Sequence, residues 1–159
     1  MLLFKITAFP LIIVLFCSSA ILLAAILFEY IGGMRPCELC WYQRYAHIST
    51  VVLIVHALLL RKYRVLSTLL IFGTLISLLT GTGLALFHVG VELQWFTTGC
   101  TTSISATTPE ELREIILSAP LIPCDEVAWT LGGISMAGWN VISSLLLALI
   151  TLYSILKSR

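Results

Sequence analysis

The chain has 159 residues, of which 59% are hydrophobic and only 11% are charged, and its mean hydropathy is +1.05. A soluble domain carries about 25% charged residues, so this composition excludes an ordinary soluble protein and indicates an integral membrane protein. The formal net charge of +1 conceals an uneven distribution along the chain, and we expect no nucleic-acid partner.

Uncharged apolar runs predict the membrane-spanning segments. Three runs exceed the roughly 20 residues that span a hydrocarbon core, and a fourth needs its flanking residues to reach across. We expect helices at about residues 6–30, 41–60, 65–91 and 127–156. No A-x-A cleavage site follows the first run, so we expect it to remain as a membrane helix. The predicted fold is an all-α integral membrane four-helix bundle, one domain over residues 1–159.

The charged residues divide between the two ends of such a bundle. Six basic residues lie at the N-terminus, between the second and third helices, and at the C-terminus: Lys5, Arg61, Lys62, Arg64, Lys157 and Arg159. All eight acidic residues fall on the other side, with three arginines. The positive-inside rule therefore places both termini in the cytoplasm. The loops at about 31–40 and 92–126 face outward, into a compartment where disulfides persist.

The first outward loop leads into a Cys-x-x-Cys motif at the start of the second helix. Two intervening residues place Cys37 and Cys40 on one side of a helical turn, close enough for a disulfide or for metal ligation. If Cys40 begins the helix, the helix N-terminus favours its thiolate. Arg44 lies one turn further on. It is either an interfacial arginine that reaches to lipid head groups, or a cation that attracts an anion or a carbonyl oxygen beside Cys40.

The second outward loop predicts a short amphipathic helix between two cysteines. Thr108 is expected to be the N-cap, Pro109 the first helical residue and Glu111 the capping-box glutamate. Apolar residues then recur at helical spacing, so this helix of about ten residues is expected to lie on the bilayer surface, or else to pack on the protein. A disulfide between Cys100 and Cys124 would either staple the loop or supply a thiol that moves out to meet a protein partner.

The cysteines thus form two pairs on one predicted side of the membrane. A bilayer already confines its helices, so staples are of little use there, and electron transfer between thiols and a compound dissolved in the membrane becomes the sharper hypothesis. Cys17 is expected to be a small buried apolar residue in the first helix. His47 and His56 stand nine residues apart on the second helix, and we expect packing or local hydrogen bonds for them.

The sequence Cys37-Glu38-Leu39-Cys40-Trp41-Tyr42-Gln43-Arg44, followed by Cys100 and Cys124 in the second outward loop, resembles the DsbB family of disulfide-bond formation proteins over nearly the whole chain. His88 and the segment Ser135–Asn140 are also similar to the family. The resemblance implies a bacterial inner-membrane enzyme, a quinone-dependent protein-disulfide oxidoreductase. It would reoxidise a periplasmic DsbA-type dithiol carrier and pass the electrons to ubiquinone or menaquinone.

The resemblance also implies roles for individual residues. The expected catalytic residues are Cys37, Cys40, Cys100 and Cys124. Cys100 would form the mixed disulfide with the partner, and Cys40 would stand next to the quinone ring. Arg44 would support quinone binding, and His88 would have an interfacial polar role or contact the quinone. A metal site formed by His88 and Glu92 lacks a third ligand, so no metal is expected. Gln43 departs from the family, in which an acidic residue commonly precedes that arginine.

Several alternatives stay open at this point. A vitamin K epoxide reductase-like enzyme also places Cys-x-x-Cys beside a membrane quinone, but usually late in the chain rather than after the first helix. A DsbB-like oxidase that serves one dedicated partner is closer. A structural four-helix membrane protein with stapled outward loops is the non-enzyme hypothesis, which redox-inert disulfides would support. A metal-binding transporter is disfavoured because the helices carry few polar ligands.

Overall fold

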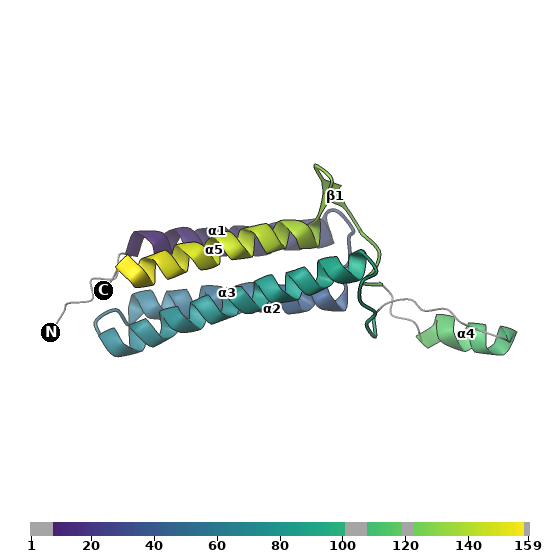
Figure 1. Cartoon of the computed structure of the whole chain (residues 1–159), viewed down its shortest axis with the longest axis horizontal. Coiled ribbons are helices and arrows are strands. Elements are labelled where there is room, and N and C mark those ends of the chain that lie inside the picture. Colours follow the sequence, from purple (N-terminus) through teal and green to yellow (C-terminus); the bar gives the residue numbers. More distant parts are fainter. Residues whose placement is uncertain (1–7, 101–107, 119–122, 158–159) are drawn as a thin grey trace.

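The computed structural model describes residues 8–100, 108–118 and 123–157. Within them, four long helices lie side by side in an up-and-down bundle (Figure 1). They are α1 (Ala8–Tyr30), α2 (Glu38–Leu59), α3 (Arg64–Glu92) and α5 (Met136–Lys157). Among the described helices, α1, α3 and α5 are long and apolar enough to cross a membrane, whereas α2 carries more polar residues. The predicted all-α membrane bundle is confirmed.

Helix packing follows the chemistry expected inside a bilayer. α2 packs on α3, α3 on α5, and α1 on both α2 and α5. Large apolar side chains such as Phe16 and Leu69 point outward, where lipid would cover them. Small hydroxyl residues are buried between the helices, where they allow close approach: Ser18, Ser67, Thr74, Ser144 and Thr151. Cys17 is half-buried and packs against the hydrophobic core, close to the predicted role.

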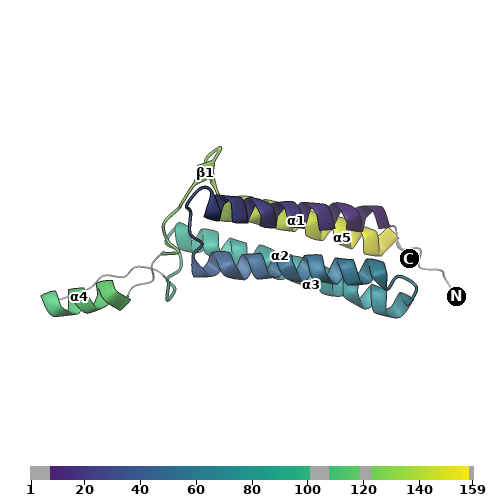
Figure 2. The same ribbon diagram turned by 180° about the vertical axis from the view of Figure 1, so that it is seen from behind.

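Three basic residues, Arg61, Lys62 and Lys157, lie at the end of the bundle opposite to the Cys-x-x-Cys motif. α1 begins and α5 ends at the same end as the short connection between α2 and α3 (Figure 2). That connection carries Arg61 and Lys62, and Lys157 closes α5. Lys5 and Arg159 lie outside the described residues. The Cys-x-x-Cys motif begins α2 at the far end, so the charge asymmetry read from the sequence corresponds to two ends of one structure.

The start of α2 differs from the sequence expectation. The helix begins at Glu38, and Cys37 is its N-cap residue, in an extended conformation with φ −73° and ψ 175°. The Cys37 sulfur accepts a hydrogen bond from the Cys40 backbone N–H, 3.3 Å away. The idea that Cys40 begins the helix is therefore wrong. Cys37 faces the first-turn N–H groups, which carry the positive end of the helix dipole.

The start of α5 also differs, because a hairpin occupies residues that the apolar run assigned to a helix. Strand β1 (Thr130–Leu131) pairs antiparallel with β2 (Ile134–Ser135). The two-residue turn between them is Gly132–Gly133, with φ of +60° and +80°, a conformation that favours glycine. α5 then begins at Met136, where Ser135 caps it by accepting a hydrogen bond from the Gly138 N–H at 3.1 Å.

The short helix of the second loop forms as α4 (Pro109–Ser118), and Figure 1 shows it beyond the cysteine end of the bundle. Glu110, Glu114 and Leu117 on this helix are exposed. The side chains of Leu112, Ile115 and Ile116 lie outside the described part, as do residues 101–107 and 119–122. The location of α4 on a bilayer surface therefore stays a prediction.

Candidate active site

Four cysteines meet in one cluster at one end of the bundle. Cys100 and Cys124 form a disulfide whose Cα atoms are 5.5 Å apart, and the Cys124 N–H donates a 2.8 Å hydrogen bond to the Cys100 carbonyl oxygen. Cys37 belongs to the same cluster, and Cys40 packs against it. Cys37 and Cys40 are free thiols with their sulfur atoms 2.8 Å apart. The spacing that predicted each pair did not reveal that the two pairs would belong to one buried cluster.

The disulfide is less accessible than its polar sequence surroundings suggest. Cys100 is 4% exposed and Cys124 is fully buried. The Thr98 hydroxyl lies 3.2 Å from the Cys100 sulfur. The expected outward movement of Cys100 stays a prediction, because residues 101–107 lie outside the described ones.

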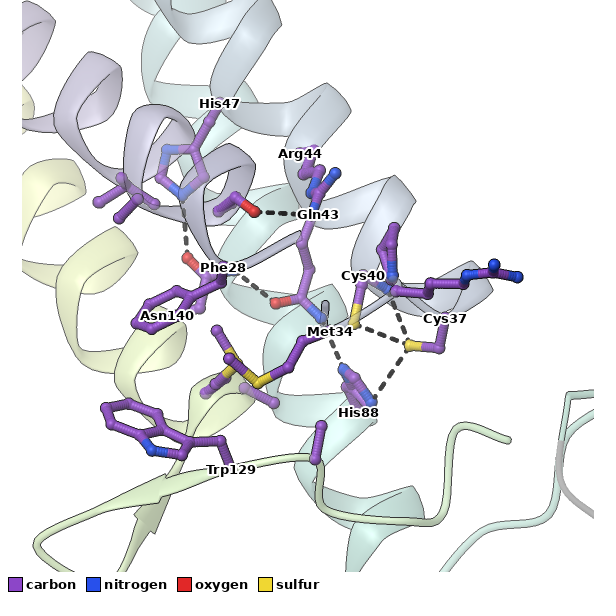
Figure 3. Close-up of a pocket in the computed structure, with 18 of the residues that line it drawn as sticks. Phe28, Met34, Cys37, Cys40, Gln43, Arg44, His47, His88, Trp129 and Asn140 are labelled. Atoms are coloured by element: carbon purple, nitrogen blue, oxygen red, sulfur yellow. Dashed lines mark hydrogen bonds between the residues drawn. The ribbon is translucent and has the colours of Figure 1, made fainter. Parts of the chain in front are cut away.

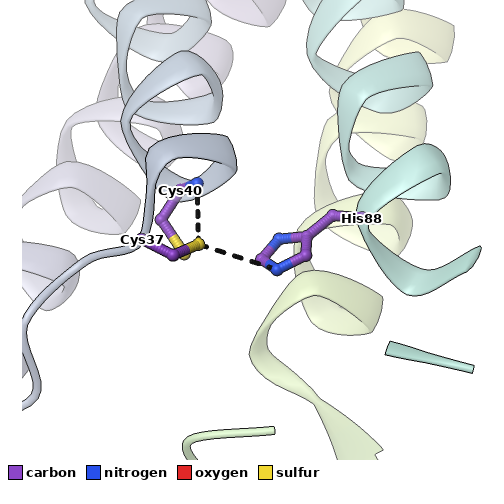
Figure 4. A group of neighbouring side chains, drawn as sticks. All are labelled: Cys37, Cys40 and His88. Carbon is purple, nitrogen blue, oxygen red and sulfur yellow. Dashed lines mark hydrogen bonds between the residues drawn. The ribbon is translucent and has the colours of Figure 1, made fainter. Parts of the chain in front are cut away.

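Cys37 is the thiol whose surroundings favour the charged form. A hydrogen bond donated by the Cys40 thiol lowers the pKa of Cys37 to about 4, and contact with His88 also lowers it, while burial opposes both effects. His88 Nε2 lies 3.7 Å from the Cys37 sulfur (Figure 4). Of the two thiols in the motif, Cys37 is therefore the one whose surroundings favour the thiolate.

The same three side chains also form a constellation of metal-ligand type. The two sulfur atoms and a ring nitrogen of His88 all lie within 4.8 Å of one another. Thiolate and imidazole are the ligands that zinc prefers, but a thiolate that holds a metal is not available for disulfide exchange. Glu92, considered from the sequence as a metal partner of His88, instead accepts a 2.5 Å hydrogen bond from Ser135.

Arg44 has a partner that the sequence did not predict. Its guanidinium forms an ion pair with Glu29 of α1 and donates a 3.1 Å hydrogen bond to the carbonyl oxygen of Ala25. It also lies 5.0 Å from the centre of the Trp41 ring. The Arg44 side chain is only 13% exposed. An arginine anchored to head groups does not account for this buried pairing.

A chain of polar side chains runs from the thiols into the bundle (Figure 3). Gln43 Nε2 lies 2.9 Å from His88 Nδ1, and Gln43 Oε1 accepts a 2.5 Å hydrogen bond from Asn140 Nδ2. Asn140 Oδ1 in turn lies 2.9 Å from His47 Nε2. His47 therefore has a long-range partner on α5, whereas His56 bonds locally to the Val52 carbonyl oxygen at 2.7 Å. Polar residues inside membrane helices were the sequence signal for this chain.

A cavity of about 250 Å³ opens beside the thiols, between α1, α2 and α5. Small-molecule sites usually occupy about 300–1,000 Å³, so this cavity suits one small ring system. Its walls are mainly apolar, and Phe28 and Trp129 contact each other there with ring centres 5.3 Å apart. Its polar lining groups are Arg35, Cys37, Cys40, Gln43, Arg44, His47, His88, Glu92, Glu126, Asn140 and Ser143.

Comparison with known proteins agrees with this arrangement. The family model described as "Disulfide bond formation protein DsbB" matches residues 7–154, which include both cysteine pairs. The "Disulfide bond formation protein B" of Haemophilus influenzae is 28% identical over 151 residues, covering 91% of this chain and 85% of the relative. The protein of the same name from Xylella fastidiosa is 32% identical over 148 residues, covering 87% and 83%. That of Pasteurella multocida is 30% identical over 142 residues, covering 84% and 80%.

Proposed function

Because the chain belongs to the DsbB family of membrane disulfide bond formation proteins, we propose that it reoxidises a periplasmic DsbA-type dithiol carrier and delivers the electrons to a membrane quinone. One observation supports this most directly: a disulfide and a dithiol lie in one buried cluster at the edge of an apolar cavity. A structural staple needs neither the second pair nor the cavity.

The proposed reaction proceeds by thiol–disulfide exchange in two stages. A thiolate of the reduced carrier attacks Cys100, and the resulting mixed disulfide resolves to leave the carrier oxidised and Cys100 and Cys124 as thiols. Exchange with an oxidised Cys37–Cys40 pair then restores the Cys100–Cys124 disulfide and leaves Cys37 and Cys40 reduced. The structure has this last combination of a disulfide and a dithiol. Each exchange needs an approach of one sulfur to another, and the membership of both pairs in one buried cluster supports such an approach.

The cavity offers what a quinone head group requires. Apolar walls accept the ring, and Cys40, Arg44 and His88 present a thiol, a cation and an imidazole to it. His47 Nδ1 is buried and has no hydrogen-bond partner among the described residues. A quinone bound here would take up two electrons from the Cys37–Cys40 pair as its disulfide forms, with one proton from the Cys40 thiol and a second from water, and would leave as quinol. Within the chain, the role of Cys37 is nucleophilic exchange and that of His88 is to hold a proton beside it.

The distribution of charge supports an assignment of the two ends of the helix bundle to the two sides of the membrane. We place the protein in the bacterial inner membrane with both termini in the cytoplasm, since Arg61, Lys62 and Lys157 lie at that end of the bundle. The cysteine cluster then faces the periplasm, where its partner would be found.

Anaerobic mixing of the purified protein with a reduced DsbA-type carrier and ubiquinone-1 tests the proposal. We expect ultraviolet absorbance to report steady reduction of the quinone by the wild-type protein. A Cys37→Ser, Cys40→Ser variant should exchange once with the carrier at Cys100–Cys124 and then stop. Continued quinone reduction by this variant would remove the motif from the electron path. Disulfides that react with neither carrier nor quinone would support the structural staple instead.

A further inference from the structure

His47 lies outside the Cys-x-x-Cys motif and makes no contact with either cysteine pair, yet it is among the most buried polar residues of the bundle, at 3% exposure. One ring nitrogen, Nε2, has two hydrogen-bonding neighbours: Asn140 Oδ1 lies 2.9 Å away and the Ser144 hydroxyl lies 3.3 Å away. The other nitrogen, Nδ1, is buried and has no hydrogen-bond partner among the described residues. A buried polar atom without a partner is costly, so this atom points to a ligand that the chain itself does not supply.

The place where such a ligand would lie is defined by the cavity. His47 lines the same space as Cys40 and Arg44, but from a position two turns further along α2 than Cys40. The polar lining residues nearest to it along α2 and α5 already have partners within the protein: Asn140 bonds Gln43 and His47, Arg44 pairs with Glu29, and the Ser143 hydroxyl donates to backbone carbonyl oxygens. A ring with one oxygen near the thiols and a second oxygen on its opposite side would need a polar group at this depth.

With the two amides oriented as they are in the structure, the hydrogen bonds indicate which nitrogen of His47 carries the proton. Asn140 Nδ2 donates to Gln43, so Asn140 Oδ1 must accept, and His47 Nε2 is the donor. Nδ1 is then a hydrogen-bond acceptor. At the other end of the chain, Gln43 Nε2 donates to His88 Nδ1, which leaves the His88 proton on Nε2, facing the Cys37 sulfur. This polarity suits a thiolate at Cys37.

The opposite polarity is equally self-consistent. If His88 Nδ1 carries a proton, as it does in an imidazolium beside a Cys37 thiolate, it donates to Gln43, and both amides turn over. Asn140 then donates to His47 Nε2, and His47 Nδ1 becomes a donor. Each amide has one donor side and one acceptor side, so the direction of hydrogen-bond donation is common to the whole chain. The protonation of His88 is thereby linked to the hydrogen-bonding character of His47.

We propose that His47 is a ligand-contacting residue of the quinone site, whose Nδ1 hydrogen-bonds to the ring oxygen remote from the thiols. The inference rests on the proposed quinone function. As a donor, Nδ1 binds the carbonyl oxygen of the quinone; as an acceptor, it binds the hydroxyl of the quinol. The Gln43–Asn140 chain lets one side chain serve both oxidation states of the ligand.

The test compares His47→Leu, His47→Gln and the wild-type protein in lipid nanodiscs, with His56→Leu as a matched control. His56 lies on the same helix but its ring bonds to a backbone carbonyl outside the cavity. Binding of ubiquinone-1 is measured by quenching of tryptophan fluorescence, since Trp129 lines the cavity. Loss of one hydrogen bond should raise the Kd of His47→Leu roughly tenfold. His47→Gln should recover part of the affinity, and His56→Leu should match the wild type.

A second readout separates direct contact from indirect disruption. In protein labelled with ¹⁵N-histidine, the His47 Nδ1 resonance should shift when ubiquinone-1 is added, while that of His56 stays in place. An unchanged Nδ1 resonance together with equal Kd values for wild type and His47→Leu would overturn this inference alone. Failure of the wild-type protein to bind ubiquinone-1 would overturn the quinone site itself. Single-turnover exchange of a reduced carrier with Cys100–Cys124 confirms that each variant is folded.

Discussion

At the scale of single residues, Cys37 and Cys40 differ in what surrounds each sulfur. Cys37 caps α2, accepts a hydrogen bond from the Cys40 backbone N–H and, as a thiolate, accepts another from the Cys40 thiol. Cys40 lies within the helix and faces the cavity. The motif spacing could predict that the two thiols are close, but the division of roles depends on where the helix begins, which the spacing does not determine.

The low pKa of Cys37 predicts an unusual titration. Since its pKa is lowered to about 4, the sulfur should stay ionised from neutral pH down to about pH 5 and become protonated only near pH 4. Ultraviolet absorbance of the thiolate measures this in a reduced Cys40→Ser variant, which keeps a hydroxyl donor. A Cys40→Ala variant lacks the donor, so its titration should move upward toward that of an ordinary thiol. Identical curves for the two would mean that the Cys40 side chain does not stabilise the thiolate.

Arg44 combines a structural and a proposed binding role, and substitutions can separate them. Arg44→Lys keeps the charge but loses the planar fork that reaches both Glu29 and Ala25, so we expect weaker quinone binding. Arg44→Ala should raise the quinone KM about tenfold and also lower the melting temperature, because a half-buried carboxylate is left unpaired. Partner exchange at Cys100 should survive in both variants.

The double variant Arg44→Ala, Glu29→Gln is the control for this prediction. It removes the unpaired charge, so the melting temperature should recover while the quinone KM stays high. If the KM recovers as well, the arginine serves only to neutralise Glu29, and the quinone contact has to be sought around His88.

At the scale of elements, the sequence predicted the helices better than their ends. Apolar runs gave all four long helices, because membrane helices are defined by hydropathy over about 20 residues. The apolar run at about 127–156 also included a hairpin that we expected to be helical, since Trp129, Leu131 and Ile134 are as apolar as helix residues. The diglycine Gly132–Gly133 was the available signal, because adjacent glycines favour a two-residue turn.

The polar chain was beyond sequence reasoning for a different reason. Gln43 and Asn140 are 97 positions apart, and nothing in either helix alone indicates that they meet. The cysteines, Arg44 and His88 could be proposed from a local motif and a family resemblance. Their partners Glu29, Gln43 and Asn140 depend on how α1, α2 and α5 pack, which is a property of the bundle.

The hairpin predicts a position-specific effect of alanine. Gly133 has φ +80°, so Gly133→Ala should destabilise the protein by about 1 kcal/mol and disturb Ser135, which caps α5. Gly83→Ala is the control, because Gly83 is helical with open space where its Cβ would lie. There alanine should be neutral or stabilising by up to about 1 kcal/mol. Thermal unfolding in detergent measures both, and equal effects at the two sites would argue against the strained turn.

At the scale of the whole molecule, the two ends of the bundle predict a membrane topology that labelling can test. In a Cys17→Ser, Cys37→Ser, Cys40→Ser background the Cys100–Cys124 disulfide does not react. Leu117→Cys on α4 should then react with a membrane-impermeant thiol reagent in intact spheroplasts, because Leu117 is 76% exposed. Tyr63→Cys, at the basic end, should react only after lysis. The reverse pattern would invert the orientation and exclude a periplasmic partner.

The burial of the Cys100–Cys124 disulfide has a consequence for fidelity. A strongly oxidising disulfide that is open to solution would be reduced by any abundant small thiol that reached it. Because Cys100 is 4% exposed and Cys124 is 0% exposed, a small thiol has little access to either sulfur atom. Under the proposed function, this burial would favour a protein that docks beside the disulfide over a small thiol in solution. Fidelity would then depend on access to Cys100 as well as on redox potential.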